Sequence, residues 1–382
     1  MTPAARVQTA IELLDDILGG APAEKVLTAW ARRSRFAGSR DRAAVRDHVF
    51  DGLRRRNSAA AMGGGLTGRG VILGLLRQQG ADLDAIFSGA NYAPEPLSDA
   101  ERAPAVCDLP LDVPEWLVAP MRAGLGADFD SALSAMRNRA PVGLRVNLRK
   151  TTRVAAIARL SEDGVSAVPC DLADTALIVD DGARRVGQSR AYAEGWIELQ
   201  DVSSQAAVAS LPLRDGMRVL DYCAGGGGKL LAMAARIDGA FNAYDALPGR
   251  MRDLPARALR AGIRARVLSD PGADAPYDLV FCDVPCSGSG TWRRNPDAMW
   301  RFHLDDLRRI QGEQAEILNS AAALVAENGV LVYATCSVLR SENIEQIQLF
   351  LERSSGWRVV AENAQPIRPV ADGFFHTLLT RE

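Results

Sequence analysis

Two cysteines near the C-terminal end of the chain lie in contexts that suggest reactive thiols. Cys286 lies in Asp283-Val-Pro-Cys-Ser-Gly-Ser-Gly290, and Cys336 lies in Thr335-Cys-Ser337. Each segment directly follows a run typical of a buried strand, at 277–282 and at 329–334. In an open α/β sheet, ligands bind beyond the carboxyl ends of the strands. We therefore expect both thiols at a binding edge, where a thiolate could act as a nucleophile.

The cysteines also have structural interpretations. A cysteine such as Cys286, taken alone, is more often an inert buried side chain. Cys336 precedes a predicted helix, a position at which thiols are frequently reactive. Cys282 is expected to point into the sheet, and Cys107 and Cys170 are assigned no function. A redox pair of Cys282 and Cys286 is disfavoured, because the chain contains no Cys-x-x-Cys sequence.

A glycine-rich loop, Gly225–Gly228, separates a predicted strand at 217–223 from a predicted helix at 230–236. Glycines in such a loop let the backbone approach a ligand closely. The loop is not a Walker P-loop, because leucine follows Lys229. A glycine loop alone would leave its ligand open.

Two acids at the ends of later strands narrow the choice of ligand for this loop. Asp245 comes about twenty residues after the loop, where Rossmann-like sites carry a ribose-binding carboxylate. Asp270 follows a third predicted strand, at 265–269, and could accept a hydrogen bond from an adenine amino group. These features in order favour a nucleoside-cofactor site, although acids that cap turns would give the same pattern.

The elements that must position these residues alternate between strand and helix from residue 199 onward. Predicted helices at 248–261, 305–326 and 342–352 separate the strands. This alternation predicts a mostly parallel, doubly wound sheet. We therefore assign residues 199–382 to an α/β, Rossmann-like domain.

The first half of the chain has a different texture. Apolar residues recur at helical spacing through 4–56 and 69–79, and a stretch rich in proline and small residues at 88–115 is typical of a linker. Residues 1–130 therefore form a predicted helical domain with its linker. Residues 131–198 combine predicted strands and one helix with many basic side chains, so we predict a small α+β module that contacts RNA.

Composition restricts the class of protein. The 382 residues are 47% hydrophobic and 24% charged, as in an ordinary globular protein. No apolar run is long enough for a membrane span, so we expect a cytoplasmic protein. Six dispersed cysteines and three histidines argue against a disulfide framework and against a zinc site.

The net charge of −2 hides an uneven distribution. Residues 1–60 carry eleven Lys and Arg against seven Asp and Glu, and residues 131–160 carry seven basic residues and no acid. The second block could face phosphates. The alternative is a solvated surface in an arginine-rich chain, and charge alone does not separate the two.

Beyond the thiol and glycine segments, several motifs match one family. The matching segments are Gln200-Asp-Val-Ser-Ser-Gln205, Asp221-Tyr-Cys-Ala-Gly-Gly-Gly-Gly-Lys229, Asp245 with Arg250, Asp270, Asp283–Gly290, Arg294-Asn-Pro-Asp297 with Trp300, Thr335-Cys-Ser337, Glu342-Asn343 and Asp372-Gly-Phe-Phe375. Over about 140–382 the chain resembles the RsmB/NOP2/Sun-type RNA cytosine-5 methyltransferases. The helical N-terminal part is similar, more loosely, to the NusB-like domain of the bacterial rRNA members.

The resemblance implies S-adenosylmethionine as the cofactor, 16S rRNA as the RNA substrate, and a monomer without a metal ion. It implies Cys336 as the nucleophile and Cys286 as the residue that helps to release the product, with Asp283 and Lys229 at the target base. The cofactor residues it implies are Cys223, Ala224, Gly225, Gly226, Gly227, Gly228, Lys229, Asp245, Arg250, Asp270 and Asp283. The predicted RNA contacts are Arg145, Arg149, Lys150 and Arg153.

Cytosine-5 chemistry explains the need for thiols. Cytosine C5 is a poor nucleophile until a Cys336 thiolate adds to C6. C5 then takes the methyl group, a base removes the C5 proton, and elimination frees Cys336. The target base must be flipped out or single-stranded for the thiol to reach it.

The chain departs from the family pattern in the glycine loop. The usual Ala-Pro-Gly-Gly-Lys-Thr is replaced by Gly225-Gly-Gly-Gly-Lys-Leu230, which could weaken cofactor binding. Two other interpretations remain open. One keeps the cofactor but methylates tRNA or a protein, and the other is a non-catalytic RNA-binding ribosome assembly factor with a relic site.

Overall fold

A computed structural model describes residues 1–102 and 108–381. The chain divides into two compact units. The N-terminal unit comprises residues 1–119, 129–139 and 292–302, and the sheet unit comprises residues 120–128, 140–291 and 303–382. Cys107, which received no functional assignment, lies outside the described residues.

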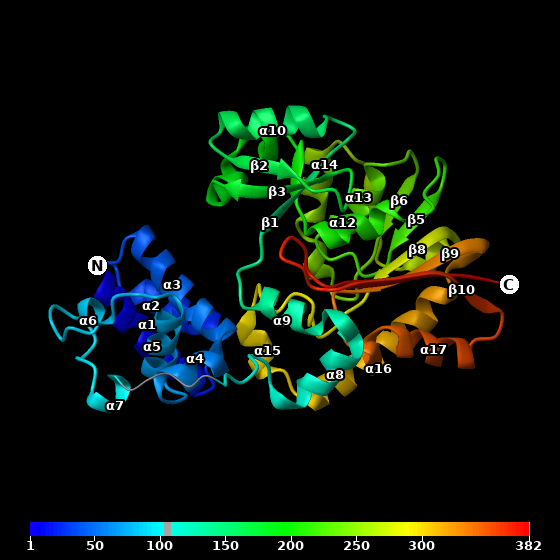
Figure 1. Cartoon of the computed structure of the whole chain (residues 1–382). Coiled ribbons are helices and arrows are strands. Elements are labelled where there is room, and N and C mark those ends of the chain that lie inside the picture. The colour runs from blue at the N-terminus through cyan, green and yellow to red at the C-terminus, as the bar shows by residue number, and fades with distance from the viewer. Residues whose placement is uncertain (103–107, 382) are drawn as a thin grey trace. The chain divides into compact units, whose positions relative to one another are not determined.

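The N-terminal unit is helical, as predicted (Figure 1). Its helices are α1 (Pro3–Leu18), α2 (Ala23–Arg33), α3 (Ser39–Arg54), α4 (Arg56–Gly63), α5 (Gly68–Gln78), α6 (Leu83–Ile86), α7 (Asp99–Arg102), the first part of α8 (Glu115–Leu125), α9 (Phe129–Met136) and α15 (Pro296–Arg301). Apolar positions at helical spacing, among them Leu14, Val49 and Ile72, meet in one core. Its likeness to NusB stays a prediction.

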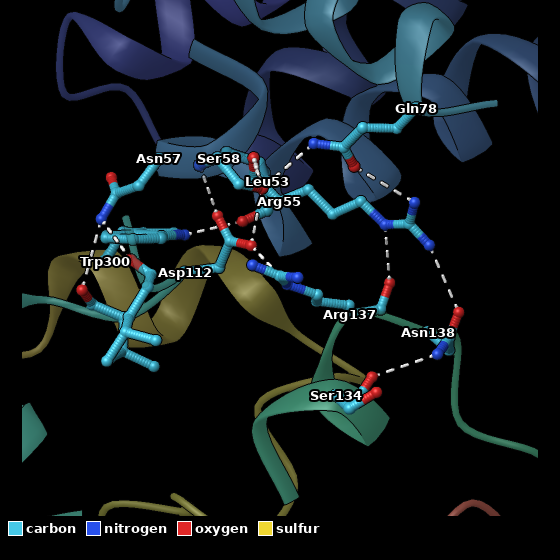
Figure 2. A network of polar contacts seen from close by, with 12 residues as sticks. Leu53, Arg55, Asn57, Ser58, Gln78, Asp112, Ser134, Arg137, Asn138 and Trp300 are labelled. Carbon is cyan, nitrogen blue, oxygen red and sulfur yellow. Dashed lines mark hydrogen bonds and ion pairs between the residues drawn. The ribbon is translucent and has the colours of Figure 1, made fainter. Parts of the chain in front are cut away.

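The end of the predicted linker at 88–115 is held firmly within this unit. Figure 2 shows the Asp112 carboxylate accepting hydrogen bonds from Ser58 N and Oγ, both at 2.8 Å, and from Arg137 Nε at 2.7 Å. Asn57 also donates to the carbonyl of Leu111 at 2.8 Å. Because Asp112 is only 7% exposed, these bonds satisfy a buried charge and anchor this stretch to α4.

A distant segment, Trp292–Phe302, also belongs to the N-terminal unit. Trp300 Nε1 donates to the carbonyl of Leu53 at 2.8 Å, and Arg54 Nε donates to the carbonyl of Arg293 at 2.7 Å. Figure 2 shows the first of these bonds. The predicted domain at 199–382 therefore does not include this segment, because the side chains of Trp292–Phe302 pack against the N-terminal helices.

The sheet unit contains two sheets. The smaller is antiparallel with strand order β2-β3-β1-β4, and α10 (Arg153–Glu162) packs on it. Its strands are β1 (Val142–Val146), β2 (Ser166–Pro169), β3 (Ala176–Asp181) and β4 (Ile197–Leu199). The short helix α11 (Arg190–Ala193) precedes β4. The predicted α+β module is thus present, with β2 as a strand that the sequence pattern missed.

The larger sheet has seven strands in the order β10-β11-β9-β8-β5-β6-β7. They are β5 (Arg218–Asp221), β6 (Ala240–Ala243), β7 (Ala265–Val267), β8 (Tyr277–Asp283), β9 (Val325–Thr335), β10 (Trp357–Gln365) and β11 (Phe374–Arg381). The strands from β5 to β9 pair in parallel, which confirms the predicted α/β, Rossmann-like fold. The antiparallel edge formed by β10 and β11 was not predicted.

Helices cover both faces of this sheet (Figure 1). One face packs against α12 (Val202–Ala209), α13 (Gly228–Ala234) and α14 (Leu254–Ala261). The other packs against α16 (Leu304–Ala322) and α17 (Ile344–Arg353). With both faces buried, the carboxyl edge of the parallel strands is the part left for ligands.

No single helix among the described residues is long and apolar enough to cross a membrane. The pair α4 and α5 meets the length and composition criteria only together, with a 93° bend between the helices. Both helices contribute buried side chains to the core of the N-terminal unit.

Candidate active site

The parallel strands β8 and β9 deliver the two predicted thiols to one place. Their register pairs Cys282 with Tyr333 and Asp283 with Ala334, so both strands end at the same edge. The loops that follow bring Cys286 Sγ to 3.4 Å from Cys336 Sγ. The two cysteines are free thiols. The hydrogen bond with Cys336, and then burial, raises the pKa of the Cys286 thiol. Cys286 therefore keeps its proton and can donate it toward Cys336 Sγ.

A buried carboxylate, Glu342, ties the two thiol loops together. Ser287, next to Cys286, donates to Glu342 through its backbone N at 2.7 Å and through Oγ at 2.5 Å. Ser337, next to Cys336, donates its Oγ to Glu342 Oε2. Glu342 is 0% exposed, so these donors stabilise a charge that would otherwise be costly to bury. Glu342 belongs to the segments that carry the family resemblance, but no role was predicted for it.

Further buried contacts hold this arrangement. Gln314 of α16 donates to the carbonyl of Pro285 at 2.9 Å and to Glu342 Oε1 at 3.2 Å. Tyr333 donates its hydroxyl to the carbonyl of Glu342 at 2.6 Å. Helix, strand and loops are therefore cross-linked around the thiols, which limits how far the sulfur atoms can separate.

Beside the thiols, Lys229 and Asp283 form an ion pair with Nζ–Oδ2 at 2.5 Å. Burial by itself would lower the pKa of Lys229, but the Asp283 carboxylate outweighs burial and the pKa is raised. Lys229 Nζ also lies 5.4 Å from the centre of the Phe374 ring. The pair places a cationic donor and a carboxylate acceptor together, which is what recognition of a polar base edge requires.

The predicted glycine loop follows β5 and leads into α13. Gly225 has φ +49° and Gly227 has φ +75°, values that favour glycine. A Cβ on Gly227 would meet Leu254 Cδ1 at 2.2 Å, so the loop lies directly against α14. The loop with glycine at 225 and 226, in place of the usual alanine and proline, is therefore still a close-fitting turn.

Asp221, at the carboxyl end of β5, is a site residue that the sequence analysis did not select. Its Oδ2 accepts from Leu230 N at 3.2 Å, and its Oδ1 is buried with no hydrogen-bond partner among the described residues. Burial, and then the negative charge of Asp283, raises the pKa of Asp221 to about 7. A strand-end acid directly before a glycine loop was the available signal.

Asp245 follows β6, as predicted, and is 3% exposed. Its Oδ2 accepts from Gly225 N at 2.9 Å, its Oδ1 accepts from Leu247 N at 2.9 Å, and Arg250 Nη1 lies 3.2 Å away. Asp245 therefore holds the glycine loop and sits where a ligand in that loop would lie. The predicted contact between Asp245 and a ribose stays a prediction.

Two further predicted cofactor residues are placed around this loop. Asp270 is exposed three residues beyond β7, and its carboxylate accepts from Gly272 N at 2.8 Å. Cys223 lies between Asp221 and the loop, and burial raises the pKa of its thiol. Cys223 is therefore a neutral side chain and not a second nucleophile. The adenine contact of Asp270 stays a prediction.

The predicted RNA contacts require a correction. Arg145 is 4% exposed, and its Nη1 donates to Gln200 Oε1 at 2.8 Å and to the carbonyl of Gly228 at 2.6 Å. Burial lowers the pKa of Arg145 to about 10. The prediction that Arg145 contacts RNA phosphates is thus wrong, because its buried guanidinium is hydrogen-bonded to the glycine loop.

The neighbouring cations are also engaged within the sheet unit. Arg149 Nε donates to the carbonyl of Ala234 at 2.6 Å, and Lys150 Nζ donates to two backbone carbonyls, of Glu194 at 2.8 Å and of Arg260 at 2.7 Å. These bonds join the small sheet to the helices that follow the glycine loop. RNA contact by Arg149, Lys150 and Arg153 stays a prediction.

The doubly wound sheet with a glycine loop at its carboxyl edge defines a Rossmann-like domain. A family model described as 16S rRNA methyltransferase RsmB/F matches residues 208–376, and one for the ferredoxin-like domain of RsmF/B-like methyltransferases matches residues 113–185. The fold is similar to the crystal structure of PH0851, with a TM-score of 0.74 and 23% identity. The match covers 100% of this chain and 99% of PH0851.

Curated relatives agree. The ribosomal RNA small subunit methyltransferase B of Vibrio cholerae is 31% identical over 287 residues, which are 70% of this chain and 65% of the relative. The protein of that name from Erwinia tasmaniensis is 30% identical over 330 residues, which are 82% of this chain and 73% of the relative. The chain therefore spans slightly less than two thirds of the first relative. It belongs to the RsmB/NOP2/Sun family of methyltransferases.

The family is dependent on S-adenosylmethionine, and the residues of this chain fit that cofactor. The unpartnered Oδ1 of Asp221 offers an acceptor for an ammonium group. Asp245 lies at the end of the next strand. Within the described residues, no group of three or more His, Cys, Asp or Glu side chains could hold a metal ion. The absence of a metal stays a prediction.

Proposed function

We propose that the protein methylates C5 of a cytosine in RNA, through a covalent bond between Cys336 and C6 of that base. The observation that carries this proposal is the pair of free thiols 3.4 Å apart, beside the Lys229–Asp283 ion pair. A single buried cysteine would not need a second thiol held at this distance by a shared carboxylate. The names of the curated relatives favour small-subunit ribosomal RNA as the substrate.

The residues have complementary roles in this mechanism. Lys229 and Asp283 hydrogen-bond the edge of the cytosine and stabilise the charge that develops when Cys336 Sγ adds to C6. Addition breaks the C5–C6 double bond, so C5 becomes nucleophilic. S-adenosylmethionine supplies the electrophilic methyl group, held by the glycine loop with Asp221 and Asp245.

Cys286 completes the cycle. While Cys336 is free, the contact with it raises the pKa of the Cys286 thiol. After methyl transfer, Cys286 passes its thiol proton to Cys336 Sγ, 3.4 Å away, and the Cys286 sulfur takes the C5 proton in its place. The electron pair of the C5–H bond restores the C5–C6 double bond, the C6–S bond breaks, and its electron pair leaves with Cys336 Sγ, which departs as a thiol.

The test is methyl transfer to defined RNA. Purified protein is incubated with labelled S-adenosylmethionine and either in vitro transcribed small-subunit rRNA or tRNA, and 5-methylcytosine is mapped in each. We expect 5-methylcytosine in the rRNA. Methylation of tRNA alone would contradict the proposal that rRNA is the substrate. If the protein binds the cofactor in a thermal-shift assay but methylates neither RNA, the result would favour the relic-site alternative.

A further inference from the structure

The turn between α2 and α3 in the N-terminal unit presents an unusual charge cluster. Residues 25–40 contain five cations and no acid. All five are exposed, and four of them are the arginines Arg32, Arg33, Arg35 and Arg40. Throughout residues 1–102 and 108–381, no hydrogen bond or ion pair involves the side chains of these four arginines. The charges are therefore available to a partner.

The turn is built to hold its exposed residues in place. Ser34 is 7% exposed and Ala37 is 2% exposed, and Ala37 N donates to the carbonyl of Ser34 at 3.0 Å. Arg35 and Phe36 lie between these two anchors, and Phe36 is 76% exposed. Because the backbone is already fixed, binding through these side chains would cost little ordering entropy.

Stability of the fold does not explain this arrangement. Arg40 lies in the first turn of α3, where the helix dipole disfavours a cation. The nearest acid, Asp41, is already bonded to the N-terminal ammonium at 3.2 Å and to Arg6 Nε at 2.8 Å. An exposed phenylalanine also loses the burial that would stabilise the domain.

Phe36 lines one hollow together with Tyr92. The hollow has a volume of about 750 Å³, within the usual range for ligand sites. Tyr92 is 89% exposed and has φ +66°, which is strained for a bulky residue. The lining also includes Gln8 and Glu12, and Gln8 Nε2 donates to Glu12 Oε1 at 2.8 Å.

We propose that this surface, defined as Arg32, Arg33, Arg35, Phe36, Arg40 and Tyr92, binds a single-stranded segment of the substrate RNA. The arginines contact phosphates, and the aromatic rings stack on unpaired bases at the hollow. The inference rests on the proposed function in that RNA is the substrate. Phosphates beside unpaired bases match cations beside exposed aromatic rings, and an acidic protein partner is the alternative that the tests below address. This surface lies in the N-terminal unit, whereas both thiols lie in the sheet unit.

The first test measures how RNA affinity depends on salt. The variant with Arg32, Arg33, Arg35 and Arg40 all changed to alanine is titrated with in vitro transcribed small-subunit rRNA at several salt concentrations. Each lost phosphate contact lowers the slope of log Kd against log salt by about 0.7 on single strands, so we expect a decrease of about 2 to 3. The control, Arg308→Ala with Arg309→Ala, removes exposed cations from α16 and should keep the wild-type slope.

The second test separates stacking from simple apolar contact. Phe36→Leu keeps an apolar side chain but removes the ring, and it should weaken RNA binding by about tenfold or more, whereas Phe36→Trp should retain binding. Circular dichroism and thermal unfolding establish that each variant is folded.

The outcomes distinguish the two proposals. If the folded arginine variant and the folded Phe36 variants all keep the wild-type Kd and salt slope, the surface does not bind RNA. That result would also be expected if the turn bound a protein partner. Wild-type protein that binds RNA through this surface but transfers no methyl group to any RNA would overturn the proposed function and leave the surface standing.

Discussion

Cys286 Sγ and Cys336 Sγ lie 3.4 Å apart although fifty residues of chain separate them. The parallel pairing of β8 with β9 brings the two loops to one edge, and Glu342 accepts hydrogen bonds from the residue after each cysteine. The carboxylate therefore sets the separation of the thiols. Unequal roles follow, because only one of two adjacent thiols can easily lose its proton at a time.

The thiols should give opposite results when they are removed one at a time. Cys336→Ala should abolish both methylation and any covalent protein–RNA product, because the bond to C6 cannot form. Cys286→Ala should accumulate that product, because the C5 proton has no acceptor. Denaturing gels and mass spectrometry of the adduct measure both effects. Cys170→Ala, outside the site, should behave as wild type, and full activity in Cys336→Ala would refute the assignment.

Glu342→Gln should act through position and not through contact with substrate. An amide NH₂ would face the hydroxyl and amide donors that the carboxylate now accepts, which should lower the free energy of unfolding by about 2–4 kcal/mol. Displacement of the thiols should lower kcat by about 10- to 100-fold. The Kd for S-adenosylmethionine should change little.

Calorimetry and steady-state kinetics measure this split for Glu342→Gln. The matched control is Glu345→Gln, an exposed carboxylate three residues later. Equal losses of kcat in both variants, or a loss confined to cofactor affinity, would show that Glu342 does not position the thiols.

Gly227→Ala should weaken cofactor binding. The new Cβ would meet Leu254 Cδ1 at 2.2 Å at a backbone φ of +75°, so the loop must shift. We expect the Kd for S-adenosylmethionine to rise about tenfold or more, since strain of this kind costs on the order of 1–3 kcal/mol. Titration calorimetry measures the change. Gly249→Ala, whose Cβ meets nothing within 4 Å, should bind normally, and normal binding by Gly227→Ala would exclude the loop as the cofactor site.

Asp221→Asn should change the pH dependence of stability in the cofactor-free protein. Burial raises the folded-state pKa of Asp221 from 3.8 to about 7. Folding therefore favours the protonated form of Asp221. The stability that this form contributes is complete below the unfolded pKa and is lost as the pH rises toward 7. Asparagine stays neutral, so the variant should gain about 2–3 kcal/mol over wild type between pH 5 and pH 8. Urea unfolding at both pH values measures this gain, and a constant difference would contradict the raised pKa.

The local sequence pattern was sufficient to predict most of the strands in the larger sheet. Buried strands that end in glycine, acid or cysteine predicted the parallel strands β5 to β9 and the edge that carries the site. For β5, β6 and β8 such a prediction works because a parallel strand covered on both faces needs a continuous apolar run; β7 lies at the edge and is largely exposed. The same rule missed β10, which is largely exposed, and β11, whose pairing partner is distant along the chain.

What the sequence by itself determined is the set of chemical groups: two thiols, the Lys229–Asp283 pair and the glycine loop. Tertiary structure decided which groups act on one another. Arg145 reads as an exposed cation in a basic block, yet folding buries it against the carbonyl of Gly228. Glu342 and Asp221 became site residues only through burial, because a carboxylate acquires a positioning role or a raised pKa from its surroundings and not from its neighbours in the chain.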